Sequence, residues 1–155
     1  MDQRRERWAF GERDVLRGMR ADELEGLPRL GESGRYLGAR PDLPEQAQDG
    51  DIPVSADGLV RPGTGGMSVS PPPVTNLALH RRPPEYGGRG KDPVFVLDAD
   101  ELPPELRYRP DPKAPERHGF VEPSRTMSFE EYRRAVQGTR ALWRQLRQEK
   151  PSARG

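Results

Sequence analysis

The glycine-rich stretch DGLVRPGTGGMSV, residues 57–69, is the part of this sequence best suited to bind a phosphate or a ribose. Glycines allow backbone amides to approach an anion, and a neighbouring serine or threonine adds a hydroxyl. The groups concerned belong to Gly65, Gly66 and Ser68. The stretch is not a Walker loop, because no Gly-Lys-Ser/Thr follows, and Pro71–Pro73 exclude the helix that a GxGxxG motif opens. Composition alone favours an ordinary surface turn, with ligand binding as the alternative.

Two further features could take part in chemistry. His118 and Glu122 are four residues apart in a segment expected to be a strand, so both side chains should lie on one face. An imidazole and a carboxylate on one surface could orient a ribose or stabilise a developing positive charge, although a solvated strand edge is the simpler interpretation. Arg17 lies among apolar residues in DVLRG and could anchor a phosphate, although an isolated arginine is more often a surface residue.

Length and composition indicate one loop-rich domain. Only 32% of the 155 residues are hydrophobic, and the 18 prolines and 17 glycines lean toward disorder. The apolar residues nevertheless cluster between turn signals, and the net charge of +1 does not hold the chain open. We therefore expect a single domain over residues 1–150, with a core from about 13 to 148 and a disordered tail at 151–155.

Composition also excludes several classes of protein. There is no cysteine and there are two histidines, His80 and His118, so neither a disulfide framework nor a metal site is expected. The charged N-terminal residues do not resemble a signal peptide, and no apolar run could span a membrane, so we expect a cytoplasmic protein. Acidic residues nearly balance the basic ones, so nucleic-acid binding is not indicated.

Hydrophobic patterns predict the elements that must position these side chains. The run PVFVL at Pro93–Leu97 predicts a strand buried on both faces. Segments Leu102–Tyr108 and Arg117–Glu122 flank a proline-rich connection and predict two antiparallel strands. The patch around Val15 is either a short strand or the start of a helix near Glu12.

A C-terminal amphipathic helix is the clearest prediction. Ser128 and Glu131 form a capping box that should begin the helix. Its apolar stripe would consist of Phe129, Tyr132, Val136, Trp143 and Leu146. Arginines would cover the remaining surface, namely Arg133, Arg134, Arg140, Arg144 and Arg147.

Several segments in this order resemble one protein family. They are GRYL at 34–37, DGL followed by PGTGGMSV at 57–69, FVLDADELPPEL at 95–106, and HGFVEPSRTM at 118–127 before the final helix. Over about residues 15–146 the chain resembles the type VI secretion exported effector two family of small bacterial toxins. The resemblance implies an α+β, ADP-ribosyltransferase-like fold in which two short antiparallel sheets surround a cleft, followed by the C-terminal helix.

The resemblance also implies roles for individual residues. It places Arg17 where the family has an arginine that contacts the phosphates of NAD. Ser68 matches one of two hydroxyl residues that follow the glycines, and Met67 stands where a threonine is typical. The amides of Gly65 and Gly66 would contribute to the cofactor site. The catalytic candidates are Ser68, His118 and Glu122, the last as a carboxylate that stabilises an oxocarbenium-like transition state.

The function implied by the resemblance is an NAD-dependent toxin of interbacterial competition. It would arrest the growth of target cells, with NAD as substrate, and a cognate, acidic immunity protein would neutralise it. A secretion-apparatus component would be a further partner, and delivery into the target cytoplasm would need no cleavable signal peptide. Two alternatives stay open: a toxin that acts by binding a cytosolic target without catalysis, and a Pro/Arg-rich interaction adaptor with little fixed structure.

Overall fold

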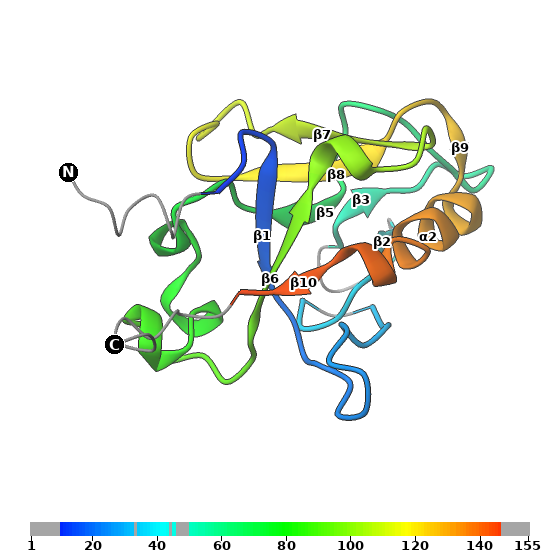
Figure 1. Cartoon of the computed structure of the whole chain (residues 1–155). Helices are drawn as coiled ribbons and strands as arrows, with labels where there is room; N and C mark the ends of the chain where they lie inside the picture. Colours follow the sequence, from blue (N-terminus) through cyan, green and yellow to red (C-terminus); the bar gives the residue numbers. More distant parts are fainter. Residues whose placement is uncertain (1–9, 33, 44, 46–49, 147–155) are drawn as a thin grey trace, which may run out of the picture.

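The computed structural model describes residues 10–32, 34–43, 45 and 50–146, and every structural statement below refers to these residues. The first sheet contains β1 (Asp14–Gly18), β6 (Val94–Asp98) and β10 (Arg144–Gln145) in the order β1-β6-β10. Both neighbouring pairs are antiparallel (Figure 1). The strand predicted at residues 93–97 is thus confirmed, and the patch around Val15 forms a strand and not a helix.

The second sheet contains β5 (Met67–Val69), β8 (Gly119–Pro123) and β7 (Leu106–Pro110) in the order β5-β8-β7, again antiparallel. The predicted strand pair is therefore present, with shorter strands than expected. The two sheets meet where β1 passes the end of β5, because the backbones of Leu16 and Ser70 exchange hydrogen bonds of 2.7 and 2.9 Å.

Shorter elements complete the fold. Strand β2 (Pro41–Asp42) pairs in parallel with β3 (Ile52–Pro53), and β4 (Leu59–Val60) pairs antiparallel with β9 (Met127–Ser128). Five 3-10 helices span Val74–Asn76, Leu79–Arg81, Pro84–Tyr86, Ala99–Glu101 and Arg140–Leu142. Within the described residues, α2 (Phe129–Gln137) is the only α-helix, and no helix has the length and apolar character needed to cross a membrane. The α+β class is confirmed.

Helix α2 begins after Ser128 as predicted, but only the Ser128 half of the predicted capping box is found among the described residues, since Oε2 of Glu131 accepts a hydrogen bond of 2.6 Å from Arg125. The end of α2 differs from the prediction. The hydroxyl of Ser128 accepts a hydrogen bond of 3.0 Å from the amide of Glu131, as an N-cap should. The helix ends at Gln137, whereas the apolar stripe predicted that it would continue to Trp143 and Leu146. Gly138 has low helix propensity, and the hydroxyl of Thr139 bonds the Val136 carbonyl and the Trp143 indole.

The chain therefore turns after Gly138, and Trp143 enters the core from a turn instead of from the helix. Arg140 lies in a 3-10 helix and Arg144 in β10, so neither lies on the helix surface as predicted. Arg147 and the expected tail at 151–155 lie outside the described residues.

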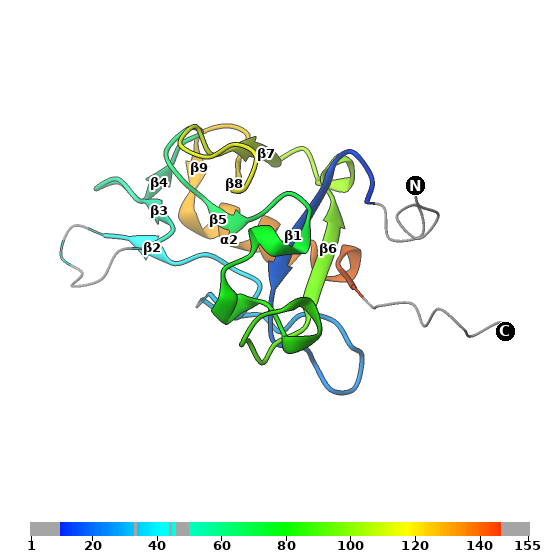
Figure 2. The same cartoon turned by 90° about the vertical axis from the view of Figure 1, so that its left-hand side faces the viewer.

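Two clusters of apolar side chains flank the first sheet. The larger lies between the two sheets and α2 and includes Val15, Phe95, Leu97, Tyr132 and Trp143. The smaller consists of Leu16, Leu77, Val94 and Val96, on the side where residues 74–86 cover the sheet (Figure 2). Successive residues of β1 and β6 thus point to opposite sides, and both sides are buried, as the PVFVL run predicts.

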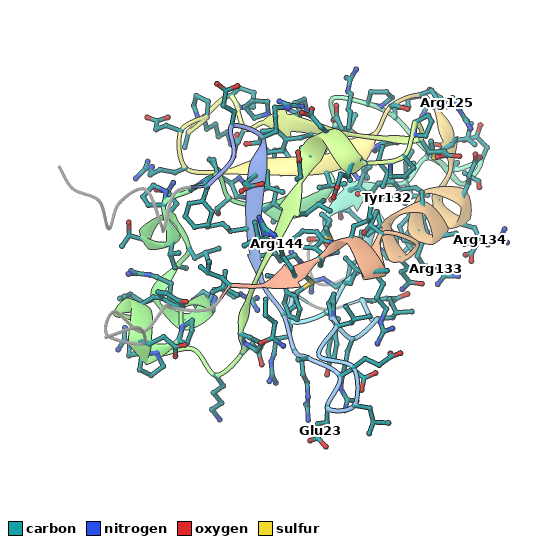
Figure 3. The ribbon with its side chains drawn as sticks, in the orientation of Figure 1. Glu23, Arg125, Tyr132, Arg133, Arg134 and Arg144 are labelled. Atoms are coloured by element: carbon teal, nitrogen blue, oxygen red, sulfur yellow. The ribbon has the colours of Figure 1, made fainter. Side chains whose placement is uncertain are left out.

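The hydroxyl of Tyr132 connects α2 to the second sheet. It accepts a hydrogen bond from the Met67 amide at 2.9 Å and donates one to the Val121 carbonyl at 2.6 Å. Tyr132 is completely buried, and burial raises its pKa. In Figure 3, Tyr132 lies on the sheet side of α2, whereas Arg133 and Arg134 project outward. The orientation of α2 is therefore fixed by a polar contact within an apolar core.

Replacing Tyr132 by phenylalanine should lower the free energy of unfolding by about 2 kcal/mol, because the buried Met67 amide would lose its partner. Urea denaturation measures this change. Tyr108→Phe is the matched control, since the Tyr108 hydroxyl makes no hydrogen bond to a described residue and its loss should cost below about 0.5 kcal/mol. Equal losses in the two variants would contradict the assignment.

Candidate functional site

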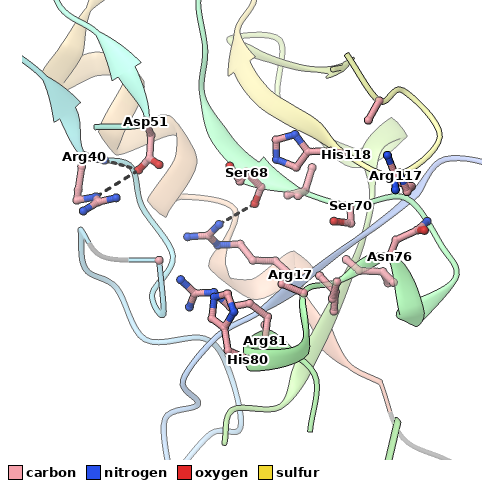
Figure 4. A pocket seen from close by; sticks show the side chains of 17 residues that line it. Arg17, Arg40, Asp51, Ser68, Ser70, Asn76, His80, Arg81, Arg117 and His118 are labelled. Carbon is pink, nitrogen blue, oxygen red and sulfur yellow. Dashed lines mark hydrogen bonds and ion pairs between the residues drawn. The ribbon is translucent and has the colours of Figure 1, made fainter. Parts of the chain in front are cut away.

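A pocket of about 540 Å³ opens beside the junction of the two sheets (Figure 4). Strands β1 and β5 form one wall, and the 3-10 helices at 74–81 and the loop at 114–118 form others. Its polar lining residues are Arg17, Arg40, Asp51, Ser68, Ser70, Asn76, His80, Arg81, Arg117 and His118. Three residues predicted from sequence, Arg17, Ser68 and His118, therefore meet in one cavity.

Arg17 is a buried cation whose hydrogen-bond partners are all backbone carbonyls. It is 7% exposed. Its Nη1 donates to the Ser68 carbonyl at 2.6 Å, and its Nη2 and Nε donate to the Tyr36 carbonyl at 2.9 and 3.3 Å. Desolvation by burial lowers the pKa of Arg17 to about 10, with Asp51 opposing part of this effect, so the guanidinium stays charged at neutral pH. No described carboxylate forms an ion pair with it.

The pocket is strongly positive compared with the chain as a whole. Among the described residues that line it, four are arginines, namely Arg17, Arg40, Arg81 and Arg117, and Asp51 is the only carboxylate. The net charge of the whole sequence is only +1. A concave site lined by one sign of charge concentrates its field and attracts counter-ions. The lining therefore favours an anionic ligand.

Arg40 adds an unsatisfied donor to this lining. Its Nε is buried without a hydrogen-bond partner among the described residues. The nearest acid is Asp51, whose Oδ2 is 4.0 Å from Nε and accepts a hydrogen bond of 2.8 Å from the Arg40 amide. A buried donor without a partner is costly, and the 4.0 Å ion pair with Asp51 compensates the charge of Arg40 only in part.

Strand β5 and the residue that follows it, Ser70, place two serines at the pocket. Met67 and Val69 are buried in the core, and the alternation of a strand places Ser68 and Ser70 on the opposite side, where both line the pocket. The second hydroxyl is thus supplied by Ser70, two residues after Ser68, and not by position 67. Ser70 is not among the predicted site residues, although the alternation in MSVS indicates it.

The ring of His118 is held at the pocket by two contacts. Its Nδ1 is 2.8 Å from Oδ2 of Asp111, and its ring meets that of Phe120 edge to face at 5.0 Å. The His118 side chain keeps 34% of its surface exposed. His118 therefore has a fixed orientation in the pocket lining.

Glu122 lies outside the pocket. Its side chain is fully buried, and its Oε1 accepts hydrogen bonds of 2.8 Å from the Gly63 amide and from Arg109. Its Oε2 accepts one of 2.6 Å from Arg107. Burial by itself raises the pKa of Glu122, but the hydrogen bonds from Arg109, Gly63 and Arg107 together hold this pKa below its ordinary value.

His118 and Glu122 nevertheless lie on the same face of this strand region, as predicted. Phe120 lies between them, in contact with His118, and Arg109 lies 4.8 Å over the Phe120 ring while bonding Glu122. The structure thus separates the two candidates by an aromatic ring. Glu122 holds the second sheet against the loop at Gly63, and its role as a catalytic carboxylate stays a prediction that this geometry does not support.

Gly65 and Gly66 serve close packing in this structure. A Cβ on Gly66, whose φ is +151°, would lie 2.5 Å from the Val121 carbonyl oxygen, and the Gly66 amide donates to the Asp51 carbonyl at 2.8 Å. A Cβ on Gly65 would lie 2.5 Å from the same Asp51 carbonyl. Neither glycine is among the residues that line the pocket, and the contact of Gly65 and Gly66 with a cofactor stays a prediction. The loop instead packs against the backbone of Asp51.

Arg81 is a further lining residue that sequence analysis missed. A Cβ on Gly34 would collide with its guanidinium, and one on Gly18 would lie 2.7 Å from its carbonyl oxygen. Glycine at these two positions therefore gives Arg81 its place beside Arg17. No periodicity in the loop sequence around Arg81 indicates this position.

The comparisons with known proteins add no assignment. No protein-family model matches this sequence, and no curated protein is significantly similar to it.

Glu122→Gln should lower the free energy of unfolding by about 3 kcal/mol at neutral pH, because Arg107 and Arg109 would lose their buried acid. The pKa of Glu122 is depressed by folding, so its contribution exists above the unfolded-state pKa and is lost as the pH falls through the folded-state pKa. The difference between wild type and variant should therefore shrink at about pH 3.

Urea denaturation at both pH values tests this prediction. Glu130→Gln is the control, since Glu130 pairs with Arg133 on the exposed side of α2 and its loss should cost below about 0.5 kcal/mol. A Glu122→Gln deficit that does not depend on pH would contradict the ion-pair explanation.

Proposed function

We propose that the pocket binds NAD and that this chain is an NAD-dependent, ADP-ribosyltransferase-like toxin. The observation on which this rests most is Arg17: a buried guanidinium with no carboxylate partner lines a pocket with three other arginines and one acid. Guanidinium groups match phosphate oxygens in geometry and charge. A diphosphate would supply the negative charge that the described residues lack.

Other properties of the site support a dinucleotide in particular. The hydroxyls of Ser68 and Ser70 and the amide of Asn76 line the same cavity and suit ribose hydroxyls. A volume of about 540 Å³ lies in the range of small-molecule sites. Two short antiparallel sheets that meet beside the pocket, with a C-terminal helix, are compatible with the ADP-ribosyltransferase-like fold that the sequence resemblance implies.

The chemistry we propose is cleavage of the bond between nicotinamide and its ribose. The ribose develops oxocarbenium character, which a nearby carboxylate stabilises. Asp51 is the carboxylate that lines the pocket, whereas both oxygens of Glu122 are engaged by Arg107, Arg109 and Gly63. We therefore assign the electrostatic role to Asp51 and the orientation of the ribose to Ser68.

The toxin part of the proposal rests on the sequence resemblance. It includes growth arrest of target bacteria, delivery by a type VI apparatus without a cleavable signal, action in the cytoplasm and neutralisation by an immunity protein. The positive pocket lining supports an acidic immunity protein, because a partner that presents carboxylates at the opening would complement it.

A second candidate is a toxin that binds its target without catalysis. It is favoured by the state of the two acids, since Glu122 is sequestered and Asp51 accepts a hydrogen bond from the Arg40 amide. The pocket would then bind an anionic group of a cytosolic target. Retained toxicity without NAD turnover separates this candidate from the first.

NAD binding should weaken about tenfold in Arg81→Gln, because one of the four pocket cations is removed. Isothermal titration calorimetry of NAD with the purified protein measures this change. The side chain of Arg81 makes no hydrogen bond to a described residue, so the fold should persist. Arg134→Gln, an equal change of charge on an exposed part of α2, should bind NAD as the wild type does. No binding by the wild type would overturn the NAD assignment.

Expression of the wild-type chain in bacteria should arrest growth, and Ser68→Ala should relieve the arrest because the ribose would lose its orienting hydroxyl. Colony counts after induction measure toxicity, and nicotinamide release by purified protein measures the reaction. The control is Ser55→Ala, since Ser55 does not line the pocket. Growth arrest without NAD loss or a modified macromolecule would favour the non-catalytic candidate.

A further inference from the structure

Asp111 and His118 face each other across the mouth of the loop that joins β7 to β8. The Asp111 amide donates to the His118 carbonyl at 2.9 Å, and Oδ2 of Asp111 is 2.8 Å from Nδ1 of His118. The other carboxylate oxygen, Oδ1, accepts a hydrogen bond of 3.0 Å from the Lys113 amide. The carboxylate is thus fixed before it contacts the imidazole.

Ionisation of Asp111 determines which nitrogen of His118 carries the proton. The hydrogen bonds from the Lys113 amide and from His118 hold the pKa of Asp111 below its ordinary value, so it is a carboxylate at neutral pH. A carboxylate can only accept, and therefore Nδ1 of His118 must be the donor. In the neutral ring the lone pair is then on Nε2.

The second ring nitrogen of His118, Nε2, makes no hydrogen bond to a described residue, and the residue lines the pocket. Phe120 packs edge to face against His118 and is itself covered by Arg109 at 4.8 Å from its centroid. His118 lines the pocket together with Ser68 and Arg117, and Figure 4 shows it on the same side of the cavity as Ser68. Asp111 does not line the pocket and can act only through His118.

His118 is also the best-defined proton acceptor in the cavity. Arginines have no lone pair to offer. Oδ2 of Asp51 accepts a hydrogen bond from the Arg40 amide, and the electrostatic role proposed above requires Asp51 to stay ionised. His80 lines the pocket, but no described residue hydrogen-bonds its ring. A general base needs a fixed orientation as well as a lone pair, and His118 combines both.

We propose that Asp111 is a positioning residue that keeps His118 in the Nδ1–H tautomer, so that Nε2 accepts the proton of the group to be modified. The step rests on the proposed function. The acceptor's oxygen or nitrogen forms a bond to C1′ of the ribose, and the bond from C1′ to nicotinamide breaks. Nicotinamide leaves as a neutral molecule with the electron pair of that bond. The proton lost by the acceptor moves to Nε2 of His118 and from there to solvent.

The first experiment reads the tautomer directly. Ring ¹⁵N NMR of the wild-type protein should place the proton of neutral His118 on Nδ1. In Asp111→Asn the side-chain amide can donate to Nδ1, which allows the proton to sit on Nε2. Asp100→Asn changes an exposed acid away from the pocket and should leave the His118 spectrum unchanged. A wild-type ring protonated on Nε2 would overturn the proposal.

The second experiment measures how the loss of the Asp111 carboxylate changes NAD turnover. Asp111→Asn should lower kcat for NAD turnover about 100-fold and leave KM for NAD nearly unchanged, because only the proton acceptor is lost. The same substitution made in His118→Gln should have no further effect, whereas a purely structural role would act additively in both backgrounds. Additive losses would overturn the positioning role.

The two readouts keep this inference separate from the proposed function. A wild-type protein without NAD turnover would overturn the proposed function and the proton transfer with it. The tautomer of His118 would still decide whether Asp111 orients the ring. Thermal unfolding of both variants checks that they are folded under the conditions of the assay.

Discussion

The burial of a charged Arg17 within β1 is the constraint on which the rest of the site depends. Taking a guanidinium out of water costs several kcal/mol unless its donors are satisfied. The chain meets this requirement with the carbonyls of Tyr36 and Ser68, so that one side chain connects β1, the segment at 34–37 and β5. Carbonyls satisfy the donors without cancelling the charge. A positive charge therefore remains in the pocket lining at a position fixed by the backbone.

One face of β5 packs in the core, and the other face lines the pocket. Met67 and Val69 pack inward, and the Tyr132 hydroxyl holds the Met67 amide to α2. Ser68 and Ser70 consequently face the cavity, with the Ser68 carbonyl bonded to Arg17 and the Ser70 backbone bonded to Leu16. The packing of the core therefore fixes the orientation of the two serine hydroxyls. If β5 shifted its pairing by one residue, the serines would face the core and Met67 and Val69 would face the pocket.

Sequence patterns predicted the parts of the fold where local and tertiary preferences agree. The buried strand β6, the pair β7 and β8, and the Ser128 cap belong to this group. The end of α2 does not, because Thr139 and Trp143 form their own hydrogen bond and β10 adds to the first sheet. Arg17, Ser68 and His118 could be selected by residue type and spacing. Arg40, Asp51 and Arg81 could not, because they meet only through long-range contacts between loops.

Polar groups that already have hydrogen-bond partners within the protein hold the fold together, whereas polar groups without such partners can bind a ligand. Glu122 and the amides of Gly63 and Gly66 have partners within the protein, so the glycine-rich loop and its acid act as framework. Among the described residues, Arg17 has no carboxylate partner and the Nε of Arg40 has no hydrogen-bond acceptor. Residue types that suit phosphate binding occur in both groups. Groups whose charges are not already satisfied contribute most to binding, and this is why we place the anion of the proposed function in the arginine-lined pocket and not at the amides of Gly63 and Gly66.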